Sequence, residues 1–139
     1  MRRAAAGMLA LGLTFDEVLS SPYVRAKQTA DIVCKVFRIK HGVHMFNPLA
    51  PGTIPANLVS ELNHSYGKRE SLLLVGHEPD LSELVSFLTT GSSSGLSVTL
   101  KKGALCKLTV DSLQPERCAA LEWLLTAGQL ARVQARAGH

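Results

Sequence analysis

Apolar side chains recur three and four positions apart in several stretches of the chain, a spacing that places them on one face of a helix. The clearest case is residues 79–90, where Leu81, Leu84, Val85 and Leu88 share a face. Similar patterns and start signals predict further helices over residues 1–13, 22–37, 54–66 and 126–136. Ser21 and Pro22 are suited to begin the second of these, as a cap and a first helical residue.

Short apolar runs between these helices predict strands. Residues 71–76 contain Leu72-Leu73-Leu74-Val75, an unbroken run typical of a strand buried on both faces of a parallel sheet. Strands are also predicted over 15–20 and 43–46. The last third predicts strands over 97–100, 104–110 and 118–125, as antiparallel additions to the same sheet. Strands that alternate with helices indicate one α/β domain over residues 1–139.

Composition narrows the class of protein. With 46% hydrophobic and 19% charged residues among 139, the chain is neither disordered nor a collagen-like repeat or disulfide scaffold. The net charge of +4 suits an acidic substrate, but the sparse aromatics do not interleave with basic clusters, so we expect no nucleic-acid partner.

We also expect no membrane segment. The longest uncharged stretch, residues 41–60, contains three prolines, and the start, with Arg2 and Arg3 before an apolar stretch, lacks the cleavage site of a secretory signal. The three cysteines, Cys34, Cys106 and Cys118, form no close pair, which favours free thiols in a reducing, cytoplasmic environment.

Two predicted turns from strand to helix share a design. Leu19-Ser20-Ser21-Pro22 and Val75-Gly76-His77-Glu78-Pro79 each end an apolar strand, add polar residues and reach a proline. In a parallel sheet such turns lie at one edge, where ligands bind. Helix N-termini at that edge favour an anion. We therefore expect an anion site between the two turns.

Arg25 and His77 are the main candidate residues at this edge. The Arg25 guanidinium can grip a phosphate or carboxylate with two hydrogen bonds, or it can pair with an acid such as Glu78. The His77 imidazole can bind an anion, transfer a proton or act as a nucleophile, or it can simply cap the helix.

Other candidates carry less weight. Glu78 can serve as a general acid, although the helix dipole alone favours a glutamate in a first turn. His41 and His44 have the spacing of a metal pair, but no third ligand is evident in the sequence. We therefore expect no metal and no cofactor.

The sequence resembles a known family in two motifs. SSPYVRAKQTA (residues 20–30) and LLLVGHEPDLSEL (residues 72–84) are similar to motifs of the histidine phosphatase superfamily. LKKGALCKLTV and LEWLLT, farther along, resemble its phosphohistidine phosphatase (SixA-type) branch. The resemblance implies a three-layer α/β/α sandwich with a mostly parallel sheet and antiparallel C-terminal strands. It also implies transfer of a phosphoryl group to a histidine and hydrolysis of that intermediate.

Carried over to this chain, the resemblance assigns phosphate binding to Arg25 and His77, makes His77 catalytic, and leaves Ser21 and Glu78 as accessory residues. The implied partner is a phosphohistidine-bearing protein of a phosphorelay or phosphocarrier type, hence signal transduction. The family's R-H-G motif, which carries the nucleophile on a central first strand, does not occur in this sequence. Two hypotheses follow: a phosphatase truncated at its N-terminus, or a catalytically inactive pseudophosphatase that binds phosphorylated ligands.

Overall fold

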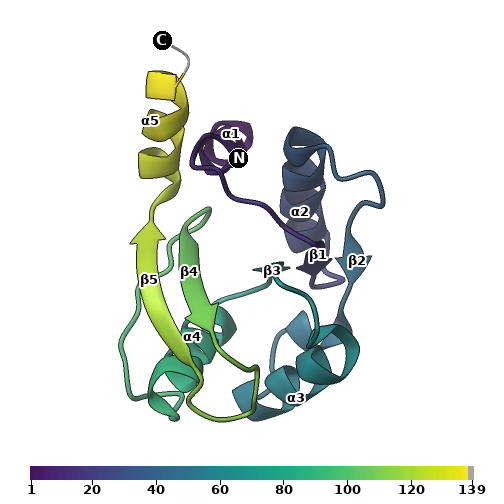
Figure 1. Ribbon diagram of the computed structural model, residues 1–139, viewed down its shortest axis with the longest axis vertical. Coiled ribbons are helices and arrows are strands. Elements are labelled where there is room, and N and C mark those ends of the chain that lie inside the picture. Colours follow the sequence, from purple (N-terminus) through teal and green to yellow (C-terminus); the bar gives the residue numbers. More distant parts are fainter. Residues whose placement is uncertain (138–139) are drawn as a thin grey trace.

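The computed structural model describes residues 1–137 and shows an α/β fold (Figure 1). In chain order its elements are α1 (Arg2–Ala10), β1 (Glu17–Ser20), α2 (Val24–Phe37), β2 (His44–Met45), the 3-10 helix η1 (Asn47–Leu49), α3 (Pro55–Tyr66), β3 (Leu72–Val75), α4 (Asp80–Thr90), β4 (Leu105–Val110), β5 (Ala119–Leu125) and α5 (Ala127–Ala137).

The first three strands form a parallel sheet in the order β2-β1-β3. Leu19 of β1 lies opposite His44, and Ser20 lies opposite Val75. Strands β4 and β5 pair with each other in antiparallel fashion and form a second, two-stranded sheet. The prediction that β4 and β5 extend the parallel sheet was therefore wrong, because neither is hydrogen-bonded to it. Their antiparallel pairing is confirmed.

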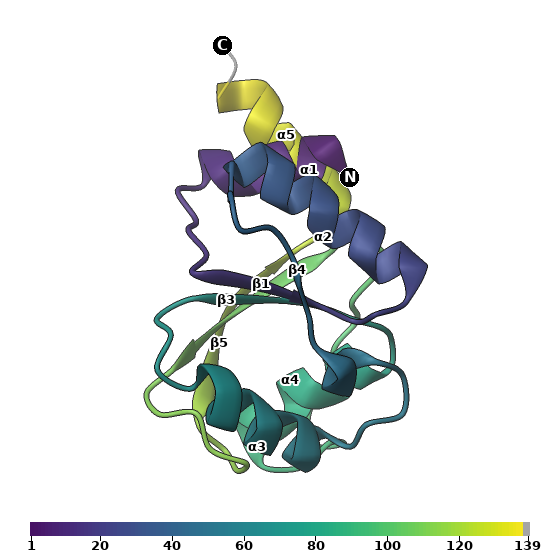
Figure 2. The same ribbon diagram turned by 90° about the vertical axis from the view of Figure 1, so that its right-hand side faces the viewer.

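Helices cover both faces of the strands, so the predicted α/β/α sandwich is confirmed. Figure 2 shows α1, α2 and α5 on one side, the strands in the middle, and α3 and α4 on the other side. Alternation along β1 divides the core between the two sides. Val18 packs with residues of α1 and α2, whereas Leu19 packs with residues of α3 and α4.

The contact between α1 and α5 joins the beginning and the end of the described chain. Ala4, Ala5 and Met8 are buried on α1 in the same cluster as Leu130 of α5. Gly7 allows the two backbones to meet, because a Cβ atom at this position would lie 1.8 Å from the carbonyl oxygen of Leu130. The first predicted helix is thus an integral part of the core.

Three local predictions need correction. Residues 97–100 form no strand. The second helix begins at Val24 with Tyr23 at its N-cap position, so Ser21 is not its cap and Pro22 is not helical. In β3 only Leu73 is buried and the other three residues are partly exposed, so the strand is not buried on both faces as predicted. No helix within residues 1–137 combines the length and apolar character needed to cross a membrane.

Candidate functional site

The turns after β1 and β3 lie side by side, as the sequence predicts. The two strands are parallel neighbours, and their last residues, Ser20 and Val75, are opposite each other in register. The backbone N–H of Ser21 donates to the carbonyl of Val75 at 2.9 Å and continues the pairing by one residue. Side chains that follow the two strands therefore emerge at one edge of the sheet.

A side-chain hydrogen bond connects the two turns directly. His77 Nε2 lies 2.7 Å from Ser21 Oγ, and the backbone N–H of Tyr23 donates to the same oxygen at 3.2 Å. Ser21 is fully buried, and the ring of Tyr23 meets the imidazole in an edge-on arrangement with 5.2 Å between centroids. Ser21 and Tyr23 together hold the His77 ring in a defined orientation.

Arg25 lies in the first turn of α2, at the same edge, and is exposed. The first turn of α2 contains no acidic residue, so the positive end of the helix dipole is not neutralised there. Among residues 1–137 no carboxylate forms an ion pair with Arg25, and the alternative pairing with Glu78 is not formed. The guanidinium and the helix N-terminus are both available to an anion.

The start of α4 has the opposite electrostatic character. Asp80 and Glu83 lie in its first turn, and Asp80 accepts a hydrogen bond from the backbone N–H of Gly52 at 2.8 Å. Glu78 is exposed and accepts a hydrogen bond from the Ser82 hydroxyl, one helical turn farther along. These carboxylates disfavour an anion at α4, so an anion at this edge is best placed on the α2 side.

This arrangement offers donors for an oxyanion, whereas the hydroxyl that is hydrogen-bonded to His77 within residues 1–137 is not accessible. Ser21, the hydroxyl group that contacts His77, is fully buried and already bonded to two partners. Sequence reasoning placed Ser21 at this edge but did not predict its contact with His77, and it missed Tyr23. The only signal in the sequence was the polar pair Ser20-Ser21 directly after an apolar strand.

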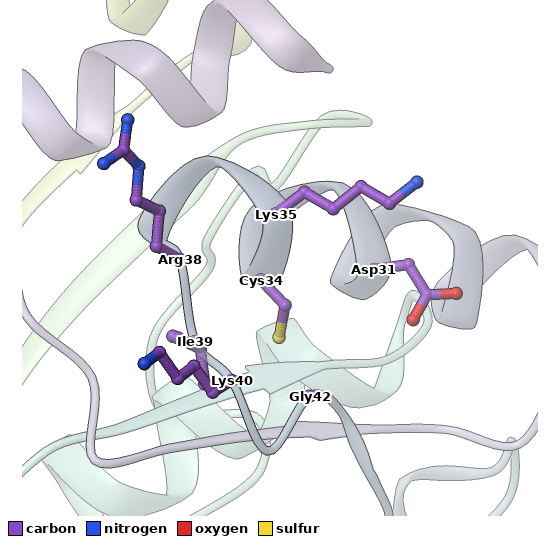
Figure 3. A pocket seen from close by; sticks show the side chains of 7 residues that line it. All are labelled: Asp31, Cys34, Lys35, Arg38, Ile39, Lys40 and Gly42. Carbon is purple, nitrogen blue, oxygen red and sulfur yellow. The ribbon is translucent and has the colours of Figure 1, made fainter.

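A surface hollow beside α2 holds none of these residues (Figure 3). The basic ends of Lys35, Arg38 and Lys40 spread in different directions there, so they do not converge on one anion. Burial, and to a smaller extent the charge of Asp31, raises the pKa of the Cys34 thiol in this hollow. A thiol that stays protonated is a poor nucleophile, so the hollow is a weaker candidate than the sheet edge.

Comparison with known proteins assigns the fold to a class. No model of a known protein family matches the chain. The structure is similar to that of the protein histidine phosphatase SixA complexed with tungstate, with a TM-score of 0.78. The match covers 93% of this chain and 80% of SixA, at 20% sequence identity. The chain therefore has a fold similar to that of SixA, and the resemblance expected from the motifs is confirmed at the level of the fold.

A sequence relative is also known. An uncharacterized protein of Picosynechococcus sp. is 36% identical over 99 residues, which make up 70% of this chain. The aligned region spans 59% of that relative, so the chain matches somewhat more than half of its length.

Proposed function

We propose that this chain binds the phosphoryl group of a phosphohistidine on a partner protein, at the sheet edge that carries Arg25 and His77. The observation that carries the proposal is the Ser21–His77 bond at the edge where α2 begins with Arg25 in its first turn, free of ion pairs within residues 1–137, in a fold similar to that of SixA. SixA has been solved with tungstate, a tetrahedral oxyanion that resembles phosphate in shape and charge. The phosphorylated partner is of the phosphorelay or phosphocarrier type.

The chemistry of the edge suits this ligand. The guanidinium of Arg25 can donate two parallel hydrogen bonds to phosphoryl oxygens, and the first N–H groups of α2 add further donors. Ser21 Oγ accepts from the Tyr23 N–H, and we propose that it donates its own hydrogen to His77 Nε2. In that arrangement neutral His77 carries its proton on Nδ1 and serves as a donor to an anion.

Turnover requires a nucleophile that this edge does not provide. We assign the phosphoryl-histidine intermediate to an intact form in which a further strand supplies the nucleophilic histidine. Within residues 1–137, β3 lies at the end of the β2-β1-β3 order and pairs on one side alone, which supports a further strand at its other edge. In that form the substrate's phosphohistidine ring is protonated on its free nitrogen, so the phosphoryl transfer releases a neutral imidazole and the need for a strong protein acid is reduced.

The second candidate is a pseudophosphatase that binds phosphorylated ligands without turnover. Two observations favour it: residues 1–139 contain no R-H-G triplet, and the hydroxyl next to His77 is buried. The two candidates predict the same binding and differ in hydrolysis.

Isothermal titration calorimetry with tungstate and with inorganic phosphate tests the shared part of the proposal. R25A and H77A are expected to weaken binding at least tenfold. K27A is the matched control, because Lys27 is an exposed cation on the same helix that pairs with Asp31 at 3.4 Å. Equal binding by the wild type and R25A would contradict the assigned site.

Hydrolysis of a phosphohistidine peptide separates the two candidates when it is measured on a form of the protein that carries the further strand. Release of phosphate by that form, lost in H77A, supports the phosphatase. Tungstate binding by that form without release of phosphate supports the pseudophosphatase.

A further inference from the structure

A second polar cluster lies at the other end of β1, away from the site described above. Glu17 is the first residue of β1, whereas Ser21 directly follows its last residue. With a rise of about 3.3 Å per residue, the Cα atoms of Glu17 and Ser21 are separated by about 13 Å. Any role of this cluster is therefore independent of the proposed function.

Strand pairing brings Glu17 and His44 onto the same face of the sheet. Leu19 and His44 are partners in the parallel pair, and Glu17 shares the face of Leu19 because side chains alternate along a strand. His44 Nε2 lies 3.4 Å from Glu17 Oε2. The turn before β2, where Gly42 has a φ of 71°, brings His41 Nε2 to 3.9 Å from the same oxygen.

One oxygen of the Glu17 carboxylate lacks a hydrogen-bond partner among the described residues. Glu17 is only 9% exposed, and its Oε2 atom is buried without a hydrogen-bond partner in the part of the chain that the structure describes. Neither imidazole is aligned for a hydrogen bond to Oε2, although both lie close to it. The other oxygen, Oε1, accepts a hydrogen bond from Arg69 Nε at 3.4 Å, which fixes the orientation of the carboxylate.

We infer that Glu17, His41 and His44 form a binding site for a divalent transition-metal ion of the zinc type. Their ligand atoms, two imidazole nitrogens and one carboxylate oxygen, all lie within 4.8 Å of one another. Two ligands at about 2.0 Å from a tetrahedral metal are about 3.3 Å apart, close to the separation of Glu17 Oε2 and His44 Nε2. His41 and His44 are each about half exposed, so an ion can enter and a water can occupy the fourth position.

The surroundings determine the expected strength of binding. Arg69 bonds to Glu17 Oε1 and orients the ligand from outside the coordination shell, as partners of metal ligands commonly do. Its positive charge opposes that of the ion, so we expect micromolar rather than tighter affinity. The metal would join β1, β2 and the turn before β2, and it would therefore stabilise the folded chain.

Zinc titration of tag-free protein by calorimetry tests the inference. The wild type is expected to bind one zinc ion per chain, and its melting temperature should rise with zinc concentration. H44Q and E17Q should each weaken binding at least tenfold. H64Q is the matched control, because His64 is exposed on α3 and lies outside the cluster, and it should bind as the wild type does. His44 is 42% exposed, so H44Q is expected to remain folded even if E17Q does not.

Cobalt(II) absorption identifies the ligand atoms. Nitrogen and oxygen ligands predict ligand-field bands without a thiolate charge-transfer band, and the ligand-field bands should be lost in H44Q. Absence of zinc binding up to millimolar concentration would overturn the inference. Equal binding by H44Q and the wild type, or a thiolate band that points to cysteine ligands, would overturn it as well.

Discussion

Ser21 Oγ and His77 Nε2, from turns that follow two neighbouring parallel strands, lie 2.7 Å apart. This bond crosses the edge at which α2 and α4 begin, and it fixes the imidazole from a fully buried position. The orientation of His77 therefore depends on the pairing of β1 with β3, not on the α4 helix alone. A change that removes the Ser21 hydroxyl should affect ligand binding without any direct contact with the ligand.

We expect S21A to weaken tungstate binding by several-fold and to lower the free energy of unfolding by about 1–3 kcal/mol. The hydroxyl is lost, so His77 is no longer oriented and the backbone N–H of Tyr23 loses its acceptor. Calorimetric titration and urea unfolding measure the two effects separately.

S86A is the matched control for S21A. Ser86 is also fully buried, and its hydroxyl donates to the Ser92 carbonyl and accepts from the Leu96 N–H. S86A should lower the free energy of unfolding by a similar amount but leave the tungstate affinity unchanged. If both variants weaken binding equally, Ser21 acts only through stability and not by positioning His77.

E78Q should leave tungstate affinity unchanged or slightly increased, because it removes a negative charge near the edge. It should lower the free energy of unfolding by about 0.3–1 kcal/mol, since the charge favours the start of α4. Binding and urea unfolding test both statements. Where the wild type hydrolyses phosphohistidine, loss of hydrolysis in E78Q with intact binding would instead identify Glu78 as a general acid.

G7A is expected to destabilise the protein by about 3 kcal/mol or to prevent folding, because the added methyl group meets the backbone of Leu130. Thermal and urea unfolding measure the loss. G128A is the control on the facing helix, where a Cβ atom would lie 3.9 Å from its nearest neighbour, Thr126 Oγ1. It should stabilise the protein by about 0.5–1 kcal/mol, and a similar loss in both variants would argue against a close α1–α5 contact.

Stability should fall as the pH rises through and above 9.0, the ordinary pKa of a cysteine thiol. Burial raises the pKa of Cys34 and of Cys106 in the folded state. The folded chain therefore keeps these protons when the unfolded chain has released them, and high pH favours unfolding. Urea midpoints across this pH range should show a smaller decline in the C34A/C106A variant, and an unchanged slope would exclude the thiols as its cause.

The sequence predicts most helices and the parallel strands because the relevant forces are local. The apolar spacing of Leu81, Leu84, Val85 and Leu88 and the glycine at position 91, whose φ is 87°, are enough to indicate α4 and its end. Residues 97–100 have an apolar–polar pattern typical of a strand, but they form none. A strand also needs a partner strand whose edge is free and in register. That requirement is set by the whole fold and cannot be read from four residues.

The candidate site was predictable as a place but not as a set of contacts. The rule that parallel strands end at a common edge predicted that the turns after β1 and β3 are neighbours, which the pairing of Ser20 with Val75 confirms. The partnership of Ser21 with His77 depends on the register of β1 against β3, which no local pattern specifies. The same is true of Glu17, which joins His41 and His44 only because β1 pairs with β2 in one particular register.

The contact between Gly7 and Leu130 also has a consequence for biosynthesis. The ribosome makes α1 well before α5, so α1 can pack early against α2 but its contact with Leu130 forms only after α5 has been made. The side of α1 that faces Leu130 therefore stays uncovered while the residues between α1 and α5 are translated. Apolar surface that is exposed in this way during synthesis favours aggregation until the contact closes.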